Sequence, residues 1–213
     1  MGTRELGTAM HRLVEGYRAF RADRWPAERD RYLKLATDGQ KPETLVITCS
    51  DSRCDPAMIF NARPGELFVI RNVAGVVPPF ESDDGHHGTS AAIAFAVLNL
   101  QVRNILVMGH VQCAGVAAVF DHGIAQDVPF LSSWVRLLAP ALKAVDGAVG
   151  REQQVAALER ECVRLSLTRL ANFPFVAERV SSGTLELNGA RFGIADGRLE
   201  ILARNSGRFI ELR

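Results

Sequence analysis

Residues 88–110, GTSAAIAFAVLNLQVRNILVMGH, join an alanine-rich apolar run to a short aliphatic run that ends in histidine. The first part, 88–100, has the length and composition of a helix, and 104–109 is apolar at nearly every position. A strand buried on both faces has a continuous apolar run, whereas a strand with one face in water alternates. This stretch therefore predicts a helix that leads into an inner strand of a parallel sheet.

The same alternation of strands and helices extends in both directions. We expect further strands at 44–49, 66–71, 184–188 and 198–203, and helices at 114–120, 151–172 and 174–182, with 127–150 also helical. Strands that alternate with helices are typical of βαβ units. The sequence therefore predicts an α/β fold, with a mostly parallel β-sheet core, flanking helices and a C-terminal antiparallel edge strand.

Two helices are predicted before the first strand. Apolar residues recur at helical spacing over 5–22, and Pro26 begins a second helix that ends at Gly39. Because these helices have no strand of their own, we expect 1–39 to be a helical arm that packs outside the sheet, on this subunit or on a partner. No linker separates the arm from 40–213, so we predict a single domain over all 213 residues.

Composition excludes several classes of protein. The 25 Lys and Arg nearly balance the 24 Asp and Glu, so nucleic-acid binding is not expected. No apolar run reaches the length of a secretion signal or a membrane span. We expect a soluble, cytoplasmic protein whose four cysteines are reduced thiols or metal ligands rather than disulfides.

Two of the predicted strands end in side chains that bind metals. The strand 44–49 ends at Cys49, and His110 and Cys113 follow the strand 104–109. Ligands of open parallel sheets bind beyond the carboxyl ends of the strands, so these side chains converge if the two strands are neighbours. Two thiolates and one imidazole suit Zn²⁺ and leave a fourth position open, as in catalytic zinc sites.

Other cysteines and histidines have simpler interpretations. A cysteine at a strand end is usually a small buried hydrophobe, and only its occurrence with His-x-x-Cys favours a metal site here. Cys54 is a rival ligand that we expect to pack in the interior, and Cys162 lies on the apolar face of a predicted helix. His86 and His87 stand in a polar loop, where a second metal site is possible but a solvated loop is favoured.

Asp51 and Arg53 lie beside the predicted metal site. A carboxylate and a guanidinium two residues apart can form a bidentate pair. Asp51 could orient a water molecule at the metal, or it could bind the metal itself as a fourth ligand and close the site. By holding the carboxylate, Arg53 would favour the open form.

The sequence resembles the β-class carbonic anhydrases, and especially their plant-type branch. The resemblance rests on Cys-x-Asp-x-Arg at 49–53, on His-x-x-Cys at 110–113, and on long stretches around them at 64–75, 77–80, 88–110, 166–176 and 184–202. It implies reversible hydration of CO2 to bicarbonate and a proton by zinc-bound hydroxide. It also implies one Zn²⁺ per chain on Cys49, His110 and Cys113, with Asp51 and Arg53 as the catalytic pair.

The resemblance also implies a substrate pocket between subunits. By position, Gln40 matches a substrate-binding glutamine that comes from the partner subunit, and Phe68 and Val73 match apolar residues of the CO2 pocket. The backbone N–H near Ala114 would contact bicarbonate. The implied assembly is a homodimer or a higher homo-oligomer with each active site at the subunit interface.

Four positions depart from the family's pattern. Phe95, in the CO2 pocket, stands where plant-type members carry Tyr, and Ala114 stands where the family usually has Gly. Asn188 replaces a frequent His, and Val46 replaces the Trp of the bicarbonate-regulated branch, so that branch's regulatory pocket is not expected. Phe95 and Ala114 leave room for a non-catalytic zinc-binding or redox-sensing protein as an alternative to carbonic anhydrase activity. A hydrolase of CO2-like molecules such as CS2 or COS is a further alternative.

Overall fold

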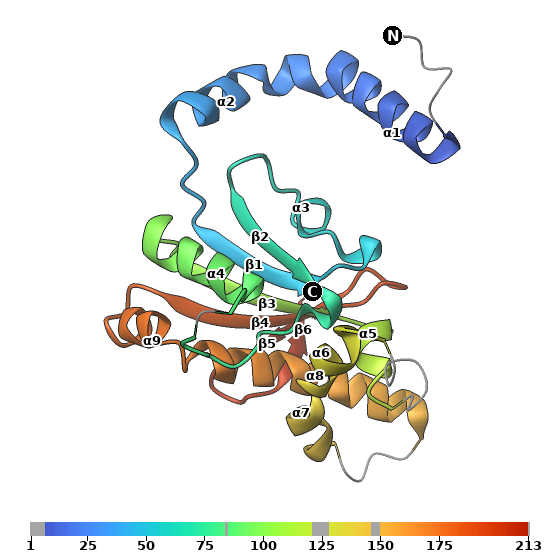
Figure 1. The fold of residues 1–213 in the computed structure, drawn as a ribbon, viewed down its shortest axis with the longest axis vertical. Helices are drawn as coiled ribbons and strands as arrows, with labels where there is room; N and C mark the ends of the chain where they lie inside the picture. Colours follow the sequence, from blue (N-terminus) through green and yellow to red (C-terminus); the bar gives the residue numbers. More distant parts are fainter. Residues whose placement is uncertain (1–6, 84, 121–127, 146–149, 213) are drawn as a thin grey trace. The chain divides into compact units, whose positions relative to one another are not determined.

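The computed structural model describes residues 7–83, 85–120, 128–145 and 150–212 (Figure 1). The chain divides into two compact units, Met1–Gln40 and Lys41–Arg213. The division falls one residue after the predicted boundary between the arm and the core. No helix in the described part of the chain has the length and hydrophobicity needed to cross a membrane.

Lys41–Arg213 is built on one six-stranded sheet with the strand order β2-β1-β3-β4-β5-β6 (Figure 1). The strands β1 to β4 are parallel, and β5 and β6 are antiparallel to their neighbours. Their bounds are β1 Thr44–Cys49, β2 Leu67–Asn72, β3 Asn104–His110, β4 Glu186–Phe192, β5 Leu199–Leu202 and β6 Phe209–Glu211. The predicted α/β fold with a mostly parallel sheet and an antiparallel C-terminal edge is confirmed.

The C-terminal strands differ from the sequence prediction in two respects. The strand expected at 184–188 runs instead over Glu186–Phe192, and the short strand β6 was not predicted. The apolar pattern breaks at Gly189 and Arg191, which hid the second half of β4. Gly189 faces Val163 so closely that a Cβ would lie 2.8 Å from that side chain, and Arg191 is buried beside the buried carboxylate of Glu159, with which it pairs.

Helices and single helical turns connect the strands. The Ala-rich helix predicted at 88–100 is α4 (Gly88–Ala94), which continues as the π-helical turn η5 (Phe95–Asn99). The other elements of this unit are η3 Ser52–Cys54, α3 Pro56–Ile59, η4 Val73–Gly75, α5 Ala114–Ala117, α6 Leu131–Arg136, α7 Ala139–Lys143, α8 Arg151–Leu170 and α9 Pro174–Ser181. The helical prediction for 127–150 is confirmed by α6 and α7, and residues 127 and 146–149 lie outside the described residues.

The two inner strands are buried on both faces. Leu45 and Ile47 of β1 pack with Ile105 of β3 in the main apolar core, to which α4, η5, α8 and α9 contribute. Val46, the alternate residue of β1, packs on the other face with Met108 of β3. Every residue of β1 after Thr44 is buried, so the strand is covered on both faces, as its nearly continuous apolar run predicts.

Met1–Gln40 is helical along nearly all of its described length. The helices α1 (Thr8–Ala19) and α2 (Trp25–Asp38) are joined through a π-helical turn, η2 (Phe20–Arg24), and form one continuous run rather than two separate helices. Pro26 lacks the N–H that would bond the preceding turn, and the π-helical turn falls there. None of these helical residues is buried.

Candidate metal centre

The ends of β1 and β3 bring three potential metal ligands together. These strands are parallel neighbours, with Thr48 opposite Met108, so their carboxyl ends lie at the same edge of the sheet. Cys49 ends β1, His110 ends β3, and Cys113 caps the N-terminus of α5. Their ligand atoms all lie within 4.8 Å of one another, and the two Sγ atoms are 3.9 Å apart.

The chemistry of this cluster fits a soft divalent cation. His110 is 1% exposed, and its Nδ1 donates to the Val111 carbonyl at 2.9 Å. Its Nε2 is buried without a hydrogen-bond partner, alone among the buried side-chain nitrogens and oxygens of the described residues. An unpaired buried nitrogen costs free energy, and a metal ion would use its lone pair. The predicted triad of Cys49, His110 and Cys113 therefore has the donors and the orientation for zinc.

The two ligand thiols affect each other's protonation. The Cys113 thiol, with that of Cys54, lowers the pKa of the Cys49 thiol far below its usual range. The same contact with Cys49 raises the pKa of the Cys113 thiol. The cluster thus favours one thiolate and opposes a second, because two neighbouring negative charges repel each other. A bound dication would offset this repulsion and allow both thiols to ionise.

Asp51 and Arg53 form the bidentate pair that their spacing predicts. Arg53 Nε donates to Asp51 Oδ1 at 2.9 Å and Nη2 donates to Oδ2 at 2.7 Å, while the Arg53 backbone N–H also bonds Oδ1. These bonds from Arg53 lower the pKa of the Asp51 carboxyl to about 2. Asp51 is not among the converging ligand atoms, so the structure has the open arrangement in which Arg53 holds the carboxylate.

Arg71 holds the loop that carries this pair, and sequence reasoning missed it. Its Nε donates to the Cys49 carbonyl at 3.0 Å, and Nη2 donates to the Asp51 carbonyl at 2.5 Å. Nη1 reaches the Asp55 carboxylate at 3.1 Å. The sequence did contain an indication of this role: Arg71 is a charged residue near the end of an otherwise apolar strand, and a half-buried charge needs polar partners.

The structure brings some of the expected CO2-pocket residues together. The rings of Phe68 and Phe95 pack with their centroids 5.8 Å apart. Val73 begins η4 and is 40% exposed, and its carbonyl accepts a hydrogen bond from Trp134 Nε1 at 2.8 Å. Ala114 is the first residue of α5. Gln40 belongs to the other compact unit, so its role stays a prediction.

The other two cysteines and His87 have the simpler roles that the sequence favours. Cys54 is fully buried and outside the ligand cluster, and its thiol points at the Asp51 carbonyl, 3.1 Å away. Cys162 lies in the apolar core, where burial raises the pKa of its thiol to about 12. His87 pairs with Asp83 on the surface at 2.6 Å. Glu81, Asp83 and His87 could together hold an ion, but such exposed acidic groups are common without one.

A second residue missed from the sequence is Glu159 of α8. It is 2% exposed and accepts a hydrogen bond from the Cys113 backbone N–H at 3.1 Å. The sequence indication would have been a carboxylate on the buried face of a predicted helix, because an acidic residue is almost never fully buried without a partner. Its partner, Arg191, interrupts the apolar pattern of β4 in the same way.

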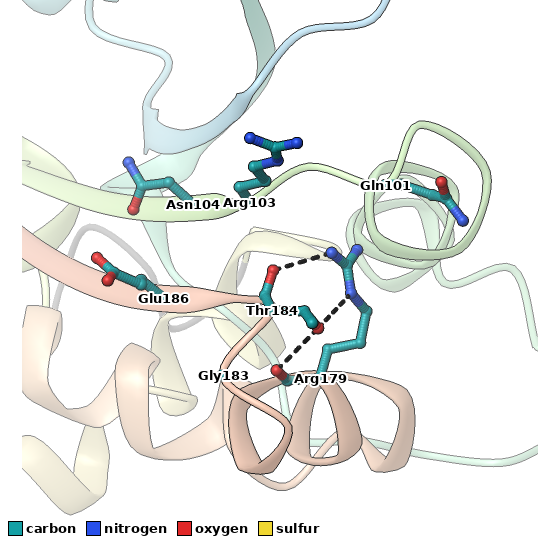
Figure 2. Close-up of a pocket in the computed structure, with 7 residues that line it drawn as sticks. All are labelled: Gln101, Arg103, Asn104, Arg179, Gly183, Thr184 and Glu186. Carbon is teal, nitrogen blue, oxygen red and sulfur yellow. Dashed lines mark hydrogen bonds between the residues drawn. The ribbon is translucent and has the colours of Figure 1, made fainter.

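A polar pocket lies at the opposite end of the sheet, where β3 and β4 begin. It has a volume of about 820 Å³ and is lined mainly by polar residues, among them Arg103, Arg179 and Thr184. Figure 2 shows Arg179 of α9 reaching Thr184 just before β4, where its Nη2 donates to the Thr184 carbonyl at 3.0 Å. Its Nη1 donates to the Val97 carbonyl at 2.9 Å. Arg179 therefore joins α9 to η5 and to the segment before β4.

Comparisons with known proteins agree with this architecture. A family model described as carbonic anhydrase matches residues 44–199. "Beta carbonic anhydrase 3" of Arabidopsis thaliana is 33% identical over 199 residues, which are 91% of this chain and 76% of that protein. A carbonic anhydrase of Pseudomonas aeruginosa is 35% identical over 206 residues, which are 95% of this chain and 92% of that one.

Solved structures give the same result. The β-carbonic anhydrase CcaA superposes with a TM-score of 0.89 at 29% identity, over 96% of this chain and 100% of that one. One of two tetrameric β-carbonic anhydrases of Sordaria macrospora superposes with a TM-score of 0.82 at 28% identity, over 97% of this chain and 100% of that one. The converging Cys-His-Cys triad, the six-stranded sheet and these similarities lead to one conclusion: the chain belongs to the β-carbonic anhydrase family.

Proposed function

We propose that this protein catalyses the reversible hydration of CO2 with one Zn²⁺ per chain, held by Cys49, His110 and Cys113. The observation that carries the proposal is the unpaired, buried Nε2 of His110 beside two thiols at the ends of neighbouring parallel strands. Zinc on three protein ligands would lower the pKa of a water molecule and so supply hydroxide. Because two thiolates cancel the formal charge of Zn²⁺, we expect activity to rise toward alkaline pH.

Asp51 has the role of hydrogen-bond acceptor for the reacting water. Arg53 holds both carboxylate oxygens, so the carboxylate stays ionised and is kept from binding the metal. A fixed acceptor orients the water and takes part in moving its proton. The same pair argues against the non-catalytic alternative, in which Asp51 would be a permanent fourth ligand.

The substrate pocket combines an apolar wall with a few hydrogen-bond donors. CO2 is small, uncharged and apolar, so it needs an apolar surface rather than a charged one. Phe68, Phe95 and Val73 supply that wall in the proposal, and the packed rings of the two phenylalanines support it. The donors are the Gln40 amide and the backbone N–H near Ala114.

We further propose that the enzyme is a cytoplasmic homodimer or a higher oligomer whose active sites lie between subunits. The exposed apolar residues of the N-terminal helices support this, since Met10, Leu13 and Tyr17 are 48–68% exposed. Such a face is buried in most stable proteins. In this arrangement Gln40 enters the active site of the partner subunit.

The decisive experiment measures zinc content and the CO2 hydration rate on the same preparation, from mildly acid to alkaline pH. We expect one zinc per chain and a rate that increases with pH. Zinc binding without hydration at alkaline pH would support the non-catalytic alternative. Turnover of COS or CS2 in place of CO2, measured as the release of sulfide, would support the hydrolase alternative.

A further inference from the structure

A buried carboxylate connects the candidate metal centre to the long helix α8. Both oxygens of Glu159 are used: Oε1 accepts from the Cys113 backbone N–H at 3.1 Å, and Oε2 accepts from Arg191 Nη2 at 2.6 Å and Nε at 3.0 Å. Glu159 is 2% exposed and Arg191 is 6% exposed. Glu159 therefore joins a predicted zinc ligand to a buried guanidinium on β4.

This ion pair continues to the surface of the protein. Arg191 Nη1 donates to Glu200 Oε2 at 2.9 Å, and Arg160 Nη2 donates to Glu200 Oε1 at 2.7 Å. The side chains of Glu200 and Arg160 are 24% and 32% exposed. Acidic and basic groups thus alternate from Cys113 outward, and each buried charge has a partner of opposite sign, as burial requires.

The backbone that carries Cys113 depends on these tertiary bonds. Gln112, just before Cys113, has φ of +56°, a conformation that costs free energy for a residue with a side chain. The helix that follows, α5, is only four residues long. Besides the Glu159 bond, the turn is held by the Val111 N–H, which donates to the Phe192 carbonyl of β4 at 2.8 Å. The end of β4 thus supports the turn directly through the Phe192 carbonyl and indirectly through Arg191, which pairs with Glu159.

We infer that Glu159 and Arg191 are positioning residues that hold Cys113 in place for the metal and so slow the loss of zinc. Neither residue is a catalytic residue, because both act through the Cys113 backbone. The inference rests on the proposed zinc site. Partners that orient metal ligands in this way are typically worth about 10–100-fold in metal affinity.

The test compares the rate at which zinc passes from each folded variant to a chromogenic chelator. In Glu159→Gln, the amide oxygen can accept from the Cys113 N–H only if the NH2 group faces the two Arg191 donors, and in the opposite orientation the NH2 group faces the Cys113 N–H, so at least one of the three bonds is lost. We expect zinc release to become about tenfold faster or more. In the double variant Glu159→Gln/Arg191→Gln two amides can pair again, and we expect part of the loss to be recovered.

The matched control is Glu161→Gln, on the same helix, where Glu161 pairs with Arg164 and is outside this network. Its zinc release should stay within twofold of the native rate. Cobalt-substituted protein gives a second readout, because the thiolate-to-cobalt absorption reports the geometry of the sulfur ligands, and it should change in Glu159→Gln but not in Glu161→Gln. Arg191→Lys keeps the charge and serves if Glu159→Gln does not fold; about threefold or more faster release is expected.

Native zinc release and an unchanged cobalt spectrum in folded Glu159→Gln would overturn the inference, even if its unfolding temperature fell, because the pair would then serve only stability. The same result in Arg191→Lys would overturn it too. Failure of the native protein to bind zinc at all would instead overturn the proposed function, so the two failures are distinguishable.

Discussion

Asp51 is the residue whose charge the proposed reaction uses most directly. It is fixed by two side-chain hydrogen bonds and one backbone hydrogen bond from Arg53. In Asp51→Asn the shape is kept, but the amide is a weaker acceptor and cannot take part in moving a proton. We expect zinc to be retained and CO2 hydration to fall on the order of a hundredfold or more. Stopped-flow hydration with metal analysis checks this, and full activity with zinc bound would remove Asp51 from the mechanism.

Cys113 is expected to bind zinc through its thiolate. In Cys113→Ser a neutral hydroxyl replaces the thiolate, so zinc should fall well below one per chain. Cys162→Ala is the matched control, since Cys162 is buried like Cys113 but is not one of the three converging ligands. It should keep its zinc. Elemental analysis of both variants makes the comparison, and a full complement of zinc in Cys113→Ser would exclude this ligand.

The Asp51–Arg53 pair should make stability depend on acid pH. Because the pKa of Asp51 is about 2 in the folded chain against an ordinary 3.8, the folded state favours the carboxylate. The stabilisation is therefore complete above about pH 5 and is lost as the pH falls from there toward 2. Urea unfolding of the native protein and of Arg53→Met should differ most near neutral pH and converge toward pH 2. A difference that is constant over this range would contradict the assignment.

At the scale of elements, the close contact between β1 and η4 holds the loop after Cys49. Gly75 in η4 has φ of +62°, and a Cβ there would lie 2.9 Å from Cys49 N and from Thr48 C, both backbone atoms. We expect Gly75→Ala to lower the free energy of unfolding by about 1–3 kcal/mol and to weaken zinc binding.

The matched control for this change is Gly88→Ala. Gly88 is the first residue of α4, and a Cβ there meets no atom within 4 Å. Its free energy of unfolding should stay within about 0.5 kcal/mol of native. Chemical denaturation of the two variants makes the test, and equal stabilities would show that η4 can move away from β1 at little cost.

At the scale of the whole molecule, the proposed exchange of Gln40 between subunits can be tested by complementation. Gln40→Ala and Asp51→Asn should each be nearly inactive alone. In a mixed dimer, one site would contain an intact Asp51 from one subunit and an intact Gln40 from the other. After co-refolding of equal amounts, we expect about a quarter of the native activity, because half of the dimers are mixed and each has one complete site.

The complementation experiment has its own control. Mixing Cys113→Ser with Asp51→Asn should restore no comparable activity. Each change damages the metal centre of its own subunit, so both sites of every mixed dimer are defective. Light scattering of the mixture confirms that dimers form. Activity no greater than the sum of the separate variants in the Gln40 mixture would show that Gln40 acts within its own chain or not at all.

Much of the core was predictable from local sequence. The runs TLVITC and NILVMG are apolar at most positions, as is typical of a strand buried on both faces, so β1 and β3 were placed correctly within a residue. Where polar residues enter a buried strand, as Arg191 does in β4, the pattern fails because the partner is distant in sequence. The short edge strand β6 has too few residues to show any pattern.

The sequence by itself determined the fold class, the three candidate metal ligands and the pairing of Asp51 with Arg53. Strand burial and two-residue spacings are local properties, and the strand ends of a parallel sheet must meet at one edge. Only the tertiary structure decided what holds these groups in place: Arg71 on the Asp51 loop, and Glu159 with Arg191 on Cys113. The physical reason is that a buried charge is stable only beside its partner, and chain folding chooses that partner from residues far apart in sequence.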